Sequence, residues 1–224
     1  MDKKTFALCE DFMLASMEDS AHDKEHVYRV LANAMVIAEA EEAVDYDILI
    51  CACLLHDIGR PDQIRDPSLC HAQVGAEKAY TWLLDRGFPE CFAQAVRSCI
   101  LTHRFRKNLP PQSLEAKILF DADKLDVVGA IGVARTLVYK GTVSAPLYTR
   151  MDGKISDGRE DKTPSFFQEY CYKLEKLYDR FYTDRGRELA LQRRAAAVRF
   201  YENLYEEVTQ LDEQGKICLE RHLG

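Results

Sequence analysis

Histidines and aspartates recur along the chain in an order that could build a metal site. Each stands at the end of an expected helix or on a helix expected to be buried: His26, His56, Asp57, His71, His103 and one of Asp121, Asp123 and Asp126. Imidazole and carboxylate groups without a thiolate suit Fe, Mn, Co, Ni or Mg better than a structural zinc site. Any one of these residues alone has an ordinary explanation, such as a core histidine or an ion pair. Their joint order is therefore what predicts a site for a divalent metal.

The elements that must position these residues are predicted to be helices throughout. Apolar residues recur at steps of three and four in residues 25–42, which is typical of an amphipathic helix. Residues 48–58 are apolar nearly all round and predict a central helix, capped by Asp47 and ended by Gly59 and Pro61. Further helices are expected at residues 70–85, 89–103, 113–139, 166–182 and 185–211. No strand pattern persists, so the predicted fold class is all-α.

Residues 141–162 differ from the rest because they combine glycine, proline and polar residues without a clear period. A connection this long is usually either a functional loop, here a lid over the site, or a disordered segment. The expected organisation is a helical extension at residues 1–17, a metal-binding core at 18–140, and a loop with C-terminal helices packed on that core at 141–224.

Composition limits the environment and the partners. The formal net charge is −7, so the chain as a whole is not expected to bind nucleic acid or an anionic membrane. Charged residues interrupt the segment Met1–Met17, so no signal peptide is expected. The eight cysteines are scattered without a C-x-x-C pair, which favours reduced thiols in a cytoplasmic protein. The oligomeric state stays open, a homodimer included.

Three sequence segments resemble the successive motifs of the HD superfamily. They are EHVYRV around His26, LLHDIG around His56 and Asp57, and ILFDADKLD around Asp123. The continuation DADKLDVVGAIGVAR, followed by DRGRELA, is similar to a branch of stand-alone bacterial HD-domain phosphohydrolases. The resemblance covers about residues 18–208 and implies an all-α HD helical bundle with additional C-terminal helices.

The resemblance also implies a ligand set. His26, His56, Asp57 and Asp123 would bind one metal, with Asp123 chosen because it occupies the aspartate of the family's AD-K/R-L motif. In some HD branches two further histidines hold a second metal, and His71 in HAQVG and His103 in ILTH stand where these would fall. One or two divalent ions are therefore expected. Asp57 could bridge two of them because a carboxylate has two oxygens.

Two other aspartates and several cations are expected near the site. Asp121 and Asp126 could orient ligand imidazoles or form ion pairs within their helix. Phosphate needs positive partners, and Arg60 stands where related phosphodiesterases carry a lysine that meets the substrate phosphate. Other candidate cations are Arg29, Lys124 and Arg104, while Arg106 and Lys107 are expected to be ordinary solvated cations. Asp57, Arg60 and Lys124 are the expected catalytic residues, and Arg29, Arg60 and Arg104 the expected substrate-binding residues.

The leading functional hypothesis is hydrolysis of a phosphate ester by metal-activated water, on a nucleotide or related small metabolite. A bound divalent metal lowers the pKa of water from 15.7 to about 7, which makes hydroxide available at neutral pH. A second hypothesis is an HD-fold di-iron oxygenase, which uses the same ligand types. A third is a nucleotide-binding regulator with a vestigial site, which the intact ligand set disfavours.

Overall fold

The computed structural model describes residues 1–17, 24–104 and 109–223, most of them helical. It confirms the predicted all-α class. Arg106 and Lys107 lie outside the described residues. The chain divides into two compact units, which we call unit 1 (Met1–Asp126 with Phe181–Gly186) and unit 2 (Val127–Arg180 with Arg187–Gly224). The extents expected from the sequence, 1–17, 18–140 and 141–224, stay a prediction.

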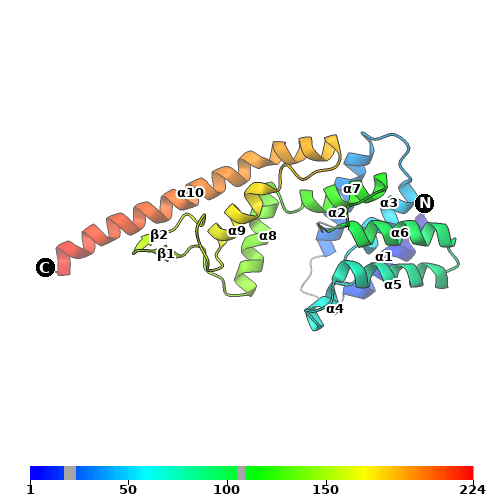
Figure 1. Cartoon of the computed structure of the whole chain (residues 1–224), viewed down its shortest axis with the longest axis horizontal. Helices are drawn as coiled ribbons and strands as arrows, with labels where there is room; N and C mark the ends of the chain where they lie inside the picture. Colours follow the sequence, from blue (N-terminus) through cyan, green and yellow to red (C-terminus); the bar gives the residue numbers. More distant parts are fainter. Residues whose placement is uncertain (18–23, 105–108, 224) are drawn as a thin grey trace. The chain divides into compact units, whose positions relative to one another are not determined.

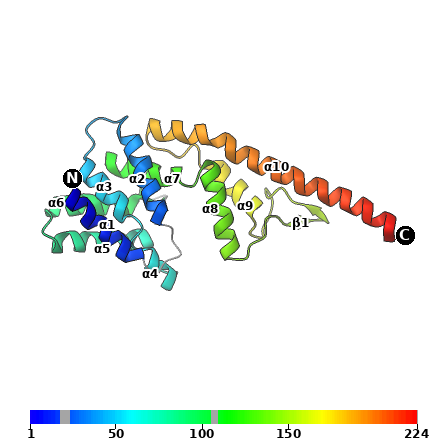
Figure 2. The same ribbon diagram turned by 180° about the vertical axis from the view of Figure 1, so that it is seen from behind.

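Unit 1 is a bundle of helices around a central apolar helix (Figures 1 and 2). Its helices are α1 (Lys3–Met17), α2 (Lys24–Ala38), α3 (Tyr46–Leu55), α4 (Arg60–Arg65), α5 (His71–Asp85), α6 (Glu90–Thr102) and α7 (Leu114–Leu125). α3 packs against α1, α2, α6 and α7. Every residue from Cys51 to Leu55 is fully buried, as the apolar run predicts for a central helix. α5 and α6 lie side by side in both views.

The start of α3 corrects the predicted cap. Asp45, not Asp47, is the N-cap, because its extended backbone lets its side chain accept from the backbone N–H groups of Asp47 and Ile48 at 3.0 and 3.1 Å. At the other end, Gly59 caps the short helix α4, and Pro61 stands in that helix's first turn. Gly59 and Pro61 therefore begin a new helix, in addition to following the central one.

The helix predicted for residues 113–139 is interrupted. α7 ends at Leu125 with Asp126 as its C-cap, and α8 (Gly129–Thr142) begins in unit 2. Gly129 has a φ of +66°, in the left-handed region that favours glycine, and a Cβ there would meet Cβ of Arg193 at 2.7 Å. The prediction of one continuous helix was wrong because this turn depends on a contact with a residue far away in sequence.

Unit 2 contains the loop for which lid and disorder were both considered, and this loop is folded. Its elements are α8, β1 (Arg150–Met151), β2 (Lys154–Ile155), α9 (Phe166–Tyr172), the 3-10 helix η1 (Leu174–Lys176) and most of α10 (Asp184–Leu223) (Figure 1). The two short antiparallel strands were not predicted, because a two-residue strand has no alternating pattern to detect. Asp152 and Gly153 form the hairpin turn with φ of +50° and +76°. The lid role stays a prediction.

The contacts of this hairpin explain its order. Arg150 forms an ion pair with Asp212 of α10, and Lys216 donates to the Gly153 carbonyl at 2.9 Å. The helix predicted at 166–182 is shorter, since α9 ends at Tyr172, whereas α10 continues past the expected residue 211 to Leu223. Among the described helices, none combines the length and the apolar character that crossing a bilayer requires.

Candidate metal centre

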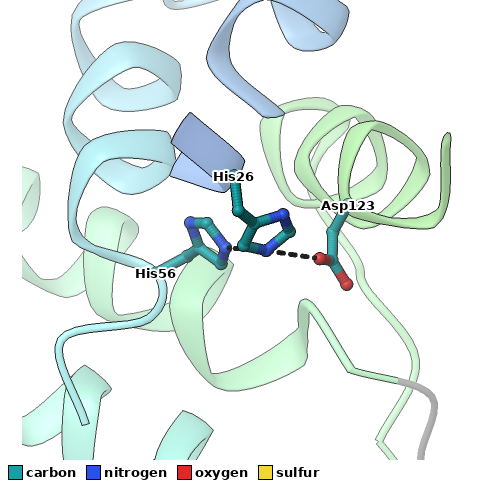
Figure 3. A group of neighbouring side chains, drawn as sticks. All are labelled: His26, His56 and Asp123. Atoms are coloured by element: carbon teal, nitrogen blue, oxygen red, sulfur yellow. Dashed lines mark hydrogen bonds and ion pairs between the residues drawn. The ribbon is translucent and has the colours of Figure 1, made fainter. Parts of the chain in front are cut away.

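Six side chains from unit 1 converge in its interior. His26 comes from the first turn of α2, His56 and Asp57 follow α3, His71 begins α5, His103 follows α6, and Asp123 lies in the last turn of α7. They form two groups, which we call the first group (His26, His56 and Asp123) and the second group (Asp57, His71 and His103). In each group the candidate ligand atoms lie within 4.8 Å of one another. Figure 3 shows the first group, with the His26 ring between His56 and Asp123.

Asp57 belongs to the second group but also faces the histidines of the first. Its Oδ2 lies 3.6 Å from Nε2 of His26 and 3.7 Å from Nε2 of His56. Its Oδ1 lies 3.5 Å from Nε2 of His71 and 3.7 Å from Nε2 of His103. The carboxylate is 1% exposed. One oxygen therefore faces each group, which is the arrangement that a carboxylate shared by two cations requires.

Two of the histidines are oriented by the ends of their own helices. Nδ1 of His56 donates to the Cys53 carbonyl at 2.7 Å, and Nδ1 of His103 donates to the Ile100 carbonyl at 2.6 Å. The last carbonyls of a helix lack intrahelical partners, so a histidine at the C-cap can satisfy one of them. Each ring then turns its other nitrogen, Nε2, toward Asp57.

The other two histidines are oriented by side chains. Nδ1 of His26 lies 2.7 Å from Oδ2 of Asp126, whose carboxylate also accepts from Arg29 at 2.7 and 3.1 Å. Asp126 thus orients the His26 imidazole, which agrees with one of the two roles considered for it. Nδ1 of His71 lies 2.6 Å from Oε1 of Gln63, in α4. Gln63 was not identified from the sequence, because its partner is eight residues away in a different helix.

The donor set fits a divalent metal. All four rings direct Nε2 inward, and Nε2 of His71 and His103 have no hydrogen-bond partner among the described residues. Nε2 of His26 and His56 face each other at 3.4 Å. A buried polar atom without a partner is costly, and here lone pairs and carboxylates share one space. The group that satisfies them all is a cation.

The protonation states agree with ligation. Burial lowers the pKa of His71 to about 2 and that of His103 to about 4, so both rings are neutral at pH 7. Burial also opposes charge on Asp57, but His56 and Arg60 hold its pKa well below the usual range. Burial opposes charge on His26, yet hydrogen bonds with Asp123, Asp126 and Asp57 raise its pKa to about 10. A cation bound by His26 would replace this proton.

The predicted cations surround the site with different partners. Arg60 donates from Nε to Oδ1 of Asp57 at 3.0 Å and is 30% exposed. Nη1 of Arg104 lies 3.3 Å from Nδ1 of His71, and Nζ of Lys124 lies 5.0 Å from the centre of the Phe120 ring. Arg29 is paired with Asp126. The substrate-binding and catalytic roles of these four residues stay predictions.

Asp121 ties α7 to residues 182 and 183. It accepts from the backbone N–H of Tyr182 at 2.9 Å, and from the backbone N–H and the hydroxyl of Thr183 at 2.7 Å each. A Cβ on Gly186 would lie 2.7 Å from its Oδ2, so a larger residue there would have to displace the Asp121 carboxylate. The sequence alone could not separate Asp121 from Asp126, because both stand in the same apolar helix.

Comparisons with known proteins agree with this geometry. Residues 24–128 match the HD domain family. The uncharacterized protein YpgQ of Bacillus subtilis is 31% identical over 204 residues, which are 88% of this chain and 89% of that protein. The crystal structure of YpgQ in complex with ADP is 28% identical, covers 89% of this chain and 97% of that one, and gives a TM-score of 0.68. A predicted HD superfamily hydrolase from an uncultured Thermotogales bacterium is 30% identical, with 92% of each chain covered and a TM-score of 0.60.

Proposed function

The chain belongs to the HD superfamily, and from this we propose that it is a metal-dependent phosphohydrolase acting on a phosphate ester of a nucleotide or related small metabolite. One observation carries the proposal. Asp57 is a buried carboxylate with Oδ2 toward His26 and His56 of the first group and Oδ1 toward His71 and His103 of its own group. Cations held by these residues would stabilise the attacking and the leaving oxygens in phosphoryl transfer.

Different residues would hold the two cations. His26, His56 and Asp123 with Oδ2 of Asp57 would hold one cation, and His71 and His103 with Oδ1 of Asp57 the other. When bound, divalent cations activate water near neutral pH and offset the charge of phosphoryl oxygens. Metals other than a structural zinc suit this oxygen- and imidazole-rich set, with Fe, Mn, Co, Ni and Mg as the candidates.

Arg60 is the cation that we propose contacts the substrate phosphate. Its Nε bonds Oδ1 of Asp57, so its planar guanidinium is fixed beside the ligands and offers two further nitrogens to an anion. Its partial exposure allows substrate to reach it. Arg104 and Lys124 add positive charge at the second group and the first group respectively, and would offset the charge of the same phosphate. Arg29 acts through Asp126 on the orientation of His26.

A nucleotide is the substrate class that we propose to test first. The related YpgQ was crystallised with ADP, which concerns that protein and supports nucleotides as ligands here. The net charge of −7 makes a local cationic site necessary for binding any phosphate, and the Asp57 region is where such a site is built.

The test combines metal analysis with a substrate screen. The purified full chain should carry divalent metal and hydrolyse a phosphomonoester, nucleotide or dinucleotide with Mn²⁺ or Co²⁺ in the absence of oxygen. Asp57→Ala should lose both metal and activity, whereas Asp85→Ala, at an exposed position of α5, should keep both. Full metal content and activity in Asp57→Ala would contradict the mechanism. Substrate turnover that requires dioxygen would favour the oxygenase instead.

A further inference from the structure

His71 differs from the other three histidines in what holds its ring. His56 and His103 donate to backbone carbonyls of their own helices, and His26 pairs with a buried carboxylate. His71 depends on a neutral amide, Oε1 of Gln63, at 2.6 Å. That amide belongs to α4, a helix of six residues. The orientation of one ligand therefore rests on a single side chain of a short helix.

Two side chains compete for the same nitrogen of His71. Oε1 of Gln63 can only accept a hydrogen bond, and Nη1 of Arg104, 3.3 Å from Nδ1, can only donate one. A neutral imidazole carries one N–H. If Nδ1 carries it, the ring donates to Gln63 and leaves a lone pair on Nε2. If Nδ1 accepts from Arg104, Nε2 carries the hydrogen and points it toward Oδ1 of Asp57, 3.5 Å away.

Only the first tautomer can bind a metal. We propose that Gln63 is a positioning residue that selects the tautomer of His71 with a free Nε2, and that it thereby sets the affinity of the second of two cation positions. This inference rests on the proposed function only in that the second group holds a cation. The contact at 2.6 Å to Gln63 is the shorter of the two, so the ligating tautomer is the one that the structure favours.

The packing of α4 holds Gln63 in reach of His71. Gly59, at the start of α4, lies directly against the first turn of α5, since a Cβ on Gly59 would meet the carbonyl oxygen of His71 at 2.3 Å and the nitrogen of Gly75 at 2.6 Å. Lys78 of α5 also forms an ion pair with Asp62 of α4. The amide is therefore pre-positioned, and no large side chain could take the place of Gly59 without moving it.

The experiment counts and titrates cations in matched variants. Mn²⁺ binding to the full chain is measured by equilibrium dialysis with elemental analysis. Gln63→Leu should weaken the second Mn²⁺ by about 10–100-fold, the usual effect of removing a partner that orients a ligand, and should leave the first unchanged. Gln63→Glu keeps the acceptor and should retain two ions. Gln73→Leu, at an exposed position of α5, should match the wild type.

A second measurement reads the tautomer directly. The ¹⁵N shifts of the His71 ring report which ring nitrogen carries the hydrogen. They are recorded with limiting Zn²⁺, so that the second group is not filled. They should show Nδ1–H in the wild type and in Gln63→Glu, and Nε2–H in Gln63→Leu. Gln63→Ala gives the same test if the leucine variant does not fold. Wild-type affinity for both ions, or an unchanged His71 tautomer, in folded Gln63→Leu or Gln63→Ala would overturn the inference, as would a wild type that binds one ion at saturation. A wild type that binds two ions without hydrolysing any phosphoester would overturn the proposed function alone.

Discussion

The two ligand groups share Asp57 but are oriented by partners of different strength. In the first group, His26 is held by the ionised carboxylate of Asp126, itself fixed by two bonds from Arg29. In the second group, His71 is held by a neutral amide and lies beside a competing guanidinium. Charge-assisted hydrogen bonds are roughly twice as strong as neutral ones. The first group is therefore expected to bind its cation more tightly and to keep it when the second has been lost.

Electrostatics point the same way. Burial opposes charge on His26, but hydrogen bonds with Asp123, Asp126 and Asp57 outweigh it and raise the pKa of His26 to about 10, so the surroundings of His26 favour positive charge. Burial lowers the pKa of His71 to about 2, and the positive neighbours Arg60 and Arg104 add to that lowering. A cation in the second group thus approaches residues that are already close to two guanidinium groups. The comparison predicts sequential filling, first group before second.

The largest effect is expected where the groups meet. Asp57→Asn keeps the size of the side chain and removes the charge that both groups use, so neither cation should bind measurably and hydrolysis should be lost. Mn²⁺ analysis and a phosphoester assay check this. His103→Ala offers the contrast, because it should remove the second cation and retain the first. Loss of a single ion in Asp57→Asn would show that the carboxylate is not shared.

Next in size is the carboxylate that orients His26. Asp126→Asn keeps an acceptor for Nδ1 but removes the negative charge, and should weaken the first cation by about 10–100-fold. Arg29→Ala should weaken it less, because Arg29 acts only through Asp126. Mn²⁺ titration of both variants measures the two effects. An equally large loss of affinity for the second cation would show that Asp126 does not act on the first group alone.

The motif residues were predictable because each sits within a short, local pattern. His56 and His103 stand at helix C-termini, where one local bond to a carbonyl three residues back fixes the ring. The partners of the histidines were harder. Arg29 is one turn from His26, yet it meets Asp126, which is 97 residues away. Such a pair is set by how α2 packs on α7, and no spacing in the sequence encodes it.

The ends of the helices were also only partly predictable from the sequence. The central helix was predictable from its apolar run, but two nearby aspartates compete for its cap and only Asp45 has the extended backbone that capping needs. The break between α7 and α8 depends on Gly129. Its positive φ and its lack of a Cβ allow the close approach of Arg193. The apolar run continues through residues 127–131 and suggested a continuous helix, but a tertiary contact fixes the break.

A smaller effect concerns stability. Saturating Mn²⁺ at a hundredfold over Kd should stabilise the native chain by about 2.7 kcal/mol per site, which corresponds to a rise in Tm of about 5–10 °C for a chain of this size. Differential scanning fluorimetry with and without chelator measures this rise. His103→Ala, which keeps the first group, should retain most of it at low Mn²⁺, whereas Asp57→Asn should show none. A full shift in Asp57→Asn would place the stabilising ion elsewhere.

The smallest effect on cation binding is expected at Asp121, which stands two residues from Asp123 on the same helix. Asp121→Ala would leave the backbone N–H groups of Tyr182 and Thr183 without their acceptor, at a cost of about 1–3 kcal/mol for the buried N–H of Thr183. Urea unfolding should therefore show a clear loss of stability, while Mn²⁺ stoichiometry and affinity stay at wild-type values. Asp126→Asn should show the reverse pattern. If Asp121→Ala releases the metal instead, then the fold around residues 181–186 and the ligand groups are coupled, and the site depends on more of unit 1 than its own ligands.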